Sequence, residues 1–176
     1  YIVTNKGINV ISTIGNVLIK NNSFEKLDKT FIKDIYIDKN KFLILLEQGV
    51  VEYIPSSGYF EDVIEGYYDH LLLDDDSNLI LSKRNQIFKY NPIKNEKELI
   101  KHIKNIKNIS LCNNYLWVNS TKKAFLLSMN SNEKHEYNNN DGLAGSLINH
   151  LDCDEDWVWF STDKGLTFYN WGRYYK

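Results

Sequence analysis

A pattern of about 40 residues recurs along this 176-residue chain and predicts an all-β fold, a segment of a β-propeller. Each copy has two apolar residues spaced three apart, then a polar turn, a large apolar residue and a second turn. These three apolar positions are filled by Ile32, Ile35 and Leu43, by Tyr68, Leu71 and Ile80, by Ile106, Ile109 and Trp117, and by Ile148, Leu151 and Trp159. Most of the chain alternates apolar and polar residues, which is typical of strands, whereas a helical repeat would space its apolar residues every 3.6 positions.

The composition is that of a folded domain. Apolar residues make up 43% and aromatic residues 14%, which excludes a disordered tail. A net charge of −2 and a pI near 6.1 argue against nucleic-acid binding, which uses a basic face. No apolar run approaches the roughly 20 residues that span a bilayer, so we expect no membrane span within this segment.

The chain opens in the middle of a copy. We expect residues 1–22 to form a partial blade, with strands at 1–4, 8–12 and 16–20 and without the innermost strand. Propellers usually remove open edges by closing their ring, but the C-terminal residues are already assigned to a blade of their own. We therefore expect the polypeptide to continue in both directions, so that the remaining blades of a larger propeller are partners of this segment.

Four complete four-stranded blades are predicted after the partial blade, at about 23–66, 67–102, 103–137 and 138–176. The run Phe42–Leu46 is continuously apolar, as expected for a strand buried on both faces. Residues 97–103 are assigned to an outer strand, although isoleucines among Lys and Glu also fit an amphipathic helical turn. Residues 172–176 are assigned to the last strand of the last blade.

Two local features have competing interpretations. The tract Asp74–Asn78 fits a hairpin turn, and it lacks the glycine and the closing glutamate of a calcium-binding EF-hand loop. We therefore predict a turn there and no metal site. Cys112 and Cys153 match no zinc spacing, and we predict two unpaired structural thiols, with a disulfide as the alternative.

Candidate ligand-binding residues come first from a polar column of the repeat. His70 and His150 occupy the same position in their copies, in a column that also contains Asp34 and Asn108, and Asp69 stands beside it. If the inner strands line a central channel, we expect these side chains to face it and to bind a ligand. The alternative is that they are hydrated polar groups without a ligand.

A second set of candidates lies in the turns between the second and third strands: Lys83, Arg84, Lys122, Lys123 and Lys164. Because such turns share one face of a propeller, they predict a basic rim that favours an anionic ligand such as an acidic glycan, or an acidic partner protein. The alternative is that they are ordinary exposed turn residues. Aromatic side chains that could stack on sugars, or pack in the core instead, are Tyr59, Tyr67, Trp171, Tyr174 and Tyr175.

Motifs of catalysis are missing from the sequence. There is no nucleophile motif, phosphate-binding glycine loop or metalloprotease motif. We therefore predict no catalytic residues, no metal and no cofactor, and favour a binding protein over an enzyme.

The last copy carries a family resemblance. Gly142 with Leu143, the run Trp157–Thr162 and the run Asp163–Leu166 resemble the two-component regulator propeller repeat. The likeness covers most of the chain in outline, but it is strong only over residues 141–170, and Phe160 with Ser161 stands where that family usually has Ile-Gly.

This resemblance implies non-enzymatic recognition of a small molecule, glycan or protein at the channel face, in the periplasm or outside the cell. It further implies the sensor region of a bacterial two-component regulator. The alternative that we retain is a secreted propeller scaffold, for adhesion or as an accessory of type IX secretion. A third interpretation follows from the streptogramin lyases, which are propellers with similar repeats and a His-centred, metal-dependent site; here His150 with Asp69 would form that site.

Overall fold

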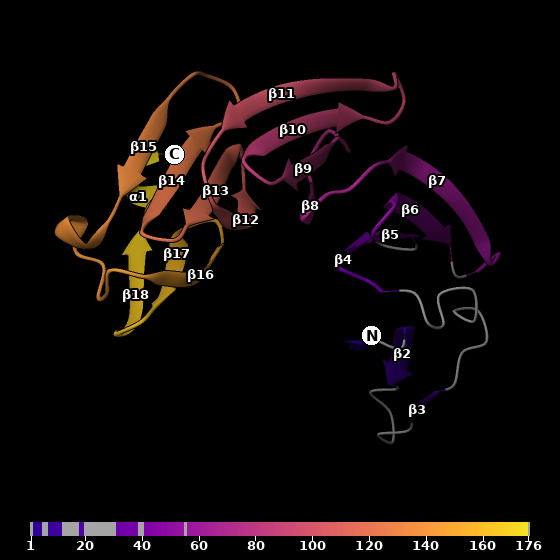
Figure 1. Ribbon diagram of the computed structural model, residues 1–176, viewed down its shortest axis with the longest axis horizontal. Coiled ribbons are helices and arrows are strands. Elements are labelled where there is room, and N and C mark those ends of the chain that lie inside the picture. The colour runs from indigo at the N-terminus through magenta and orange to yellow at the C-terminus, as the bar shows by residue number, and fades with distance from the viewer. Residues whose placement is uncertain are drawn as a thin grey trace. The chain divides into compact units, whose positions relative to one another are not determined.

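The computed structural model describes residues 2–4, 7–11, 18–19, 31–38, 41–54 and 56–175. Residues 1–71 and residues 72–176 form two compact units. The described strands make five sheets, and in each of them strands that follow one another in sequence lie side by side (Figure 1). No helix in the described ranges is long and apolar enough to cross a membrane.

The first unit contains the partial blade and one complete blade. The predicted strands at the N-terminus are confirmed as β1 (Ile2–Thr4), β2 (Gly7–Ile11) and β3 (Leu18–Ile19). The next sheet is formed by β4 (Asp34–Asp38), β5 (Lys41–Leu45), β6 (Gly49–Ile54) and β7 (Tyr59–Glu65). Four of the five residues of β5 are buried, as predicted for its apolar run, and Phe42 and Ile44 pack with Tyr53 in the core of this sheet.

The second unit contains three further sheets. The first is formed by β8 (His70–Leu73), which starts at the end of the first unit, with β9 (Leu79–Lys83), β10 (Gln86–Asn91) and β11 (Glu96–His102). The second consists of β12 (Ile106–Cys112), β13 (Tyr115–Ser120), β14 (Lys123–Ser128) and β15 (Lys134–Tyr137). After the 3-10 helix η2 (Asn139–Asp141), the third consists of β16 (Ile148–Cys153), β17 (Trp157–Thr162) and β18 (Gly165–Asn170). Strand β11 confirms the outer strand at residues 97–103, so the helical alternative is wrong.

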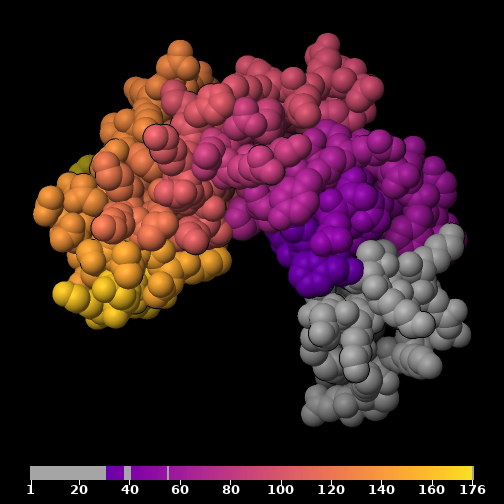
Figure 2. Space-filling view, viewed as in Figure 1, coloured from indigo at the N-terminus to yellow at the C-terminus, as the bar shows by residue number. Residues whose placement is uncertain are grey.

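Large apolar side chains fill the space between the last two sheets. The outer surfaces of these two sheets lie against each other in the space-filling view (Figure 2). Trp117 of β13 and Leu126 of β14 pack against Val158 and Phe160 of β17, and all four are buried. The rings of Trp117 and Phe160 meet edge to face with centroids 5.7 Å apart. Burial of these side chains holds the two sheets together.

The prediction of a fourth strand at residues 172–176 is wrong. Residues Gly172–Tyr175 form the short helix α1, and the last described sheet has three strands. The cause is Trp171, which is fully buried and whose Nε1 donates to the backbone oxygen of Asp154 at 3.1 Å. Because Trp171 is held there, the next residue, Gly172, lies against the turn before β17. A Cβ on Gly172 would be 2.9 Å from the Glu155 oxygen. The backbone therefore leaves the edge of β18 instead of pairing with it.

Candidate functional site

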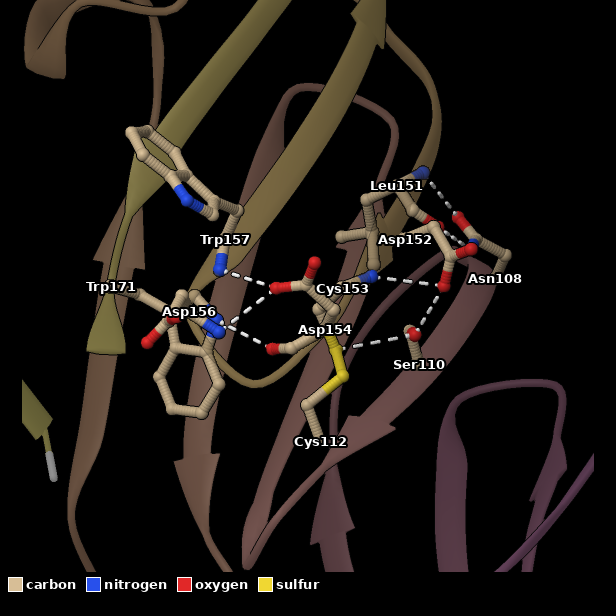
Figure 3. Close-up of a disulfide and its surroundings, with 10 residues drawn as sticks. All are labelled: Asn108, Ser110, Cys112, Leu151, Asp152, Cys153, Asp154, Asp156, Trp157 and Trp171. Atoms are coloured by element: carbon tan, nitrogen blue, oxygen red, sulfur yellow. Dashed lines mark hydrogen bonds between the residues drawn. A yellow bond between two sulfur atoms is a disulfide. The ribbon is translucent and has the colours of Figure 1, made fainter.

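The polar column of the repeat joins neighbouring innermost strands. Asn108 on β12 is buried, and its Nδ2 donates to the Leu151 oxygen at 2.6 Å while its Oδ1 accepts from the Leu151 nitrogen at 3.2 Å (Figure 3). One amide side chain thus satisfies both backbone groups of a residue in the next sheet. Asn108, a member of the polar column, therefore bonds one blade to the next. Its side chain has a structural role.

Two more links follow along the same pair of strands. The Ser110 hydroxyl contacts Asp152 Oδ1 at 2.7 Å, and Cys112 forms a disulfide with Cys153, with Cα atoms 6.1 Å apart. The prediction of two unpaired thiols is therefore wrong, and the disulfide alternative is right. Its physical reason is that Asn108, Ser110 and Cys112 point to the same side of β12 and meet consecutive residues of β16 (Figure 3).

The same relationship occurs in the first unit. Asp34 on β4 accepts a hydrogen bond from the Leu71 nitrogen through Oδ2 at 3.2 Å, and from the Ile35 nitrogen through Oδ1 at 2.9 Å. Burial raises the pKa of Asp34 above its ordinary value, and the hydrogen bonds from Leu71 and Ile35 and the nearby His70 reduce this rise without cancelling it. Asp34 therefore occupies the structural role of Asn108 with a carboxyl group, which cannot donate to the Leu71 oxygen when ionised.

Asp69 is held by a lysine of the neighbouring blade. Lys33 Nζ lies 3.8 Å from Asp69 Oδ1, donates to the Tyr68 oxygen and stands 3.5 Å from the centre of the Tyr67 ring. The Lys33 side chain is only 13% exposed. This ion pair gives Asp69 a structural partner, which weakens its interpretation as a ligand-binding or catalytic acid.

The two candidate histidines lie in different units. His70, the first residue of β8, is half-buried, and it lies close enough to Asp34 to offset part of the rise in the pKa of that carboxyl. His150 is exposed on β16, next to a bulge at Asn149 that also exposes its side chain. Within the described ranges no three His, Cys, Asp or Glu side chains are grouped as metal ligands. Ligand binding by His70 and His150 stays a prediction.

The basic candidates occupy the turns that the repeat predicts. Lys83 and Arg84 lie at the β9–β10 turn, Lys122 and Lys123 at the β13–β14 turn, and Lys164 at the β17–β18 turn. Lys123 Nζ forms an ion pair with Glu136 Oε1 of β15 at 2.5 Å. This pair neutralises part of the positive charge, and an anion-binding rim stays a prediction.

The aromatic candidates divide into core and surface. Trp171 is buried, and the Tyr175 hydroxyl hydrogen-bonds to the Tyr137 hydroxyl at 2.9 Å, so these two belong to the packing of the C-terminal residues. Tyr59, Tyr67 and Tyr174 are exposed. Tyr59 donates to Glu61, and Tyr174 stacks on Tyr169 with centroids 5.9 Å apart.

A polar groove of about 330 Å³ lies in the second unit, between the first two of its sheets. Its walls are the β8–β9 turn, the β12–β13 turn and the start of the β14–β15 connection. The lining residues are Asp74, Asp75, Asp76, Lys89, Leu111, Asn113, Asn114, Met129 and Asn130. The sequence does not predict this groove, because its walls come from separate turns. The sequence of each turn by itself predicts only an ordinary turn.

One wall of the groove is held by hydrogen bonds and an ion pair of Asp74. Asp74 Oδ1 accepts from the backbone nitrogens of Asp76 and Asn78 at 3.0 and 2.8 Å, which confirms the turn predicted for Asp74–Asn78. Lys89 Nζ pairs with Asp74 Oδ2 at 2.8 Å. Burial alone would raise the pKa of Asp74, but Lys89 and the hydrogen bonds from Asn78 outweigh it and hold that pKa below its ordinary value.

The open part of the groove offers hydrogen-bonding groups. Asp75, Asp76, Asn113, Asn114 and Asn130 are exposed there. Amides donate and accept, and carboxylates accept, so together they suit a polar ligand with several hydroxyl or amino groups. The volume is near the lower end of the range for small-molecule sites.

Many solved structures resemble this chain, and they include two extracellular domains and a surface component. The extracellular domain of BT4673 from B. thetaiotaomicron, described as a one component system, aligns with 93% of the chain at a TM-score of 0.68 and 18% identity. The extracellular domain of BT3049 from the same organism, described as a hybrid two component system, aligns with 93% at a TM-score of 0.63 and 13% identity. PorZ of Porphyromonas gingivalis, a surface component of the type-IX secretion system, aligns with 93% at a TM-score of 0.61 and 13% identity.

At these identities the likeness establishes the fold alone. The chain is a β-propeller segment. It spans 24% of the length of each of these three solved chains. No protein-family model and no curated protein matches it.

Proposed function

We propose that this chain is part of a recognition propeller that acts outside the cytoplasm and binds a polar ligand without transforming it. The observation that carries the proposal is the groove between two sheets of the second unit, with its exposed amides and carboxylates beside the hydrogen-bonded Asp74 turn. Groups of this kind recognise hydroxyl-rich molecules such as glycans through several hydrogen bonds at once.

The location outside the cytoplasm is supported by the disulfide between Cys112 and Cys153. Disulfides persist in oxidising compartments such as the periplasm or the extracellular space, and are rare in the cytosol. The structural neighbours point the same way, because two of them are extracellular domains and the third is a surface component.

Within this class we favour the sensor region of a bacterial two-component regulator. The support is the similarity to the extracellular domain of BT3049 and the propeller repeat in residues 141–170. In such a sensor the ligand would favour one of two arrangements of the propeller and so change the signal sent across the membrane. The similarity to PorZ supports a secreted scaffold as the second candidate.

Binding is tested with the purified chain on an array of neutral and acidic oligosaccharides, followed by calorimetry on the best hit. The groove variant combines Asn113→Gly with Asn130→Ala, since glycine keeps the left-handed backbone of Asn113. The matched control is Asn105→Gly, another exposed left-handed asparagine, which does not line the groove. We expect the groove variant to weaken binding at least about tenfold, as the loss of two hydrogen bonds implies, and the control to bind normally.

Three other outcomes would redirect the proposal. Binding that survives in the groove variant but is lost in a Lys122→Ala, Lys164→Ala variant would place the ligand at the basic turns. Turnover of a bound compound that His150→Ala abolishes would make the protein an enzyme and contradict non-enzymatic recognition. A coding region that continues into a membrane span and a kinase supports the sensor, whereas a stop codon without any membrane span supports the scaffold.

A further inference from the structure

One face of the last sheet exposes large apolar side chains. Leu166 and Phe168 of β18 are each 62% exposed, Trp157 of β17 is 37% exposed, and Trp159 between them in the sheet is half-buried. The Trp157 and Phe168 rings contact each other edge to face at 5.9 Å. We call these four residues the open face.

The strand pairing identifies the corresponding residues of the preceding sheet. Trp159 pairs with Phe168 across β17 and β18, as Trp117 pairs with Leu126 across β13 and β14. Two positions along, Ser161 pairs with Leu166 as Asn119 pairs with Ala124. The open face therefore corresponds to Tyr115, Trp117, Ala124 and Leu126.

In the preceding sheet this face is covered. Trp117, Ala124 and Leu126 are fully buried, in one cluster with Ile148, Leu151, Val158 and Phe160 of the next sheet. The earlier pair of sheets in the unit repeats the arrangement. Ile80 and Ile87 are buried against Ile109, Leu116, Val118 and neighbouring residues of the β12–β15 sheet. Each of these two covered faces is covered by the sheet that comes next in the sequence.

The residues that cover the preceding sheet have counterparts at nearly the same spacing in each of the four sheets from β4 to β18. Ile148, Leu151, Val158 and Phe160 stand at positions i, i+3, i+10 and i+12. The same spacing recurs at Ile106, Ile109, Leu116 and Val118, and at Ile32, Ile35, Phe42 and Ile44. In the remaining sheet the turn is one residue longer, and the set is Tyr68, Leu71, Leu79 and Leu81. All sixteen residues are buried or half-buried, and in the two sheet pairs of the second unit this apolar quartet covers the preceding sheet.

We propose that the open face packs against a further blade of the same polypeptide, and that this blade carries the same apolar quartet. Successive quartets start 36, 38 and 42 residues apart, at Ile32, Tyr68, Ile106 and Ile148. The next one therefore starts about 36 to 42 residues after Ile148, at the repeat spacing of a propeller. The solved neighbours leave room for such a blade, since this chain accounts for 24% of their length.

Thiol labelling tests the contact in the complete natural polypeptide and in the 176-residue chain. Phe168→Cys and, separately, Leu166→Cys place a thiol on the open face, and the native cysteines are protected in their disulfide. The control is Ile93→Cys, at a residue that is 90% exposed in the β10–β11 turn, away from the open face. In the short chain all three thiols should react with a water-soluble disulfide reagent at similar rates.

In the complete polypeptide we expect the two open-face thiols to react at least about tenfold more slowly than in the short chain, because labelling then requires local opening. The Ile93→Cys thiol should keep its rate. Equal rates in both proteins at all three positions would overturn the proposal. So would concentration-dependent protection in the short chain alone, which would make a second copy the occupant, or a coding region without a further quartet.

Discussion

The side-chain amide of Asn108 spans the backbone of Leu151, donating to its oxygen at 2.6 Å and accepting from its nitrogen at 3.2 Å. These two bonds connect the innermost strands of two neighbouring sheets. The bonded residues, Asn108 and Leu151, are 43 positions apart in sequence. Asp34 and Leu71 repeat one of the two bonds in the first unit. The sequence suggests that the polar column is a row of ligand-binding groups. At Asn108 and Asp34 its side chains instead connect neighbouring blades.

Replacing Asn108 by alanine should destabilise the protein by about 2–3 kcal/mol. The change removes two buried hydrogen bonds and leaves the Leu151 nitrogen and oxygen without them. Urea unfolding followed by circular dichroism measures the loss. Asn149→Ala, in the exposed bulge nearby, should stay within about 0.5 kcal/mol of the wild type. Similar losses for both variants would contradict the assignment.

Replacing Asp34 by asparagine should stabilise the protein at pH 7 by about 1 kcal/mol, the usual value of one hydrogen bond. Asparagine keeps the acceptor for the Leu71 nitrogen, offers a donor to the Leu71 oxygen as Asn108 does for Leu151, and removes a buried charge. We expect these gains to outweigh the loss of the bond from the Ile35 nitrogen to Oδ1.

The advantage of Asp34→Asn should also depend on pH. The pKa of Asp34 is raised in the folded protein, so the wild type gains stability as the pH falls through this raised pKa towards the ordinary value of 3.8. The difference between the two proteins in the free energy of unfolding should therefore shrink from pH 7 towards pH 4. A difference that grows on acidification would contradict the burial argument.

Reduction of the Cys112–Cys153 disulfide should lower the free energy of unfolding by about 2–4 kcal/mol, because the bond closes a loop between residues 41 apart in sequence. Thermal unfolding with and without dithiothreitol measures the effect, and a Cys112→Ala, Cys153→Ala variant is the control. That variant should unfold like the reduced wild type and respond to dithiothreitol no further. Two thiols titratable in the native, unreduced protein would show that the bond does not form.

Trp171→Phe should cost about 2 kcal/mol. The substitution loses the hydrogen bond from Nε1 to the Asp154 oxygen and leaves a cavity beside Tyr115 and Trp117. Trp157→Phe removes an indole of the same size from a partly exposed site and should cost less than about 1 kcal/mol. Equal effects in urea unfolding would argue against Trp171 as the anchor of the C-terminal helix.

Acidification should remove the contribution of the Asp74 turn. The pKa of Asp74 is lowered in the folded state, so its stabilisation is present above pH 3.8 and is lost as the pH falls below that value through the lowered pKa. Asp74→Ala should cost about 2 kcal/mol at pH 7 through its lost backbone hydrogen bonds. The cost should decrease at pH 2–3, measured by urea unfolding, whereas a cost independent of pH would contradict a role for the carboxylate.

Much of the architecture follows from the sequence by itself. The spacing of Ile148, Leu151 and Trp159, repeated three times upstream, determines strands, turns and the face that each strand buries, because side chains alternate between the two faces of a sheet. The outer strand β11 is an instructive case, since Ile100 within it and Ile103 and Ile106 after it also fit a helix, whereas the repeat predicts a strand.

The tertiary structure decided what this pattern leaves open. Whether Asn108 binds a ligand or a neighbouring strand, and whether Cys112 meets Cys153, depends on how two sheets pack, which alternation within one strand does not encode. A short helix and not a fourth strand follows Trp171, whose indole is buried in the core of the last two sheets, and this packing appears only in the tertiary structure. The groove at Asn113 and Asn130 likewise exists only where turns of two sheets meet.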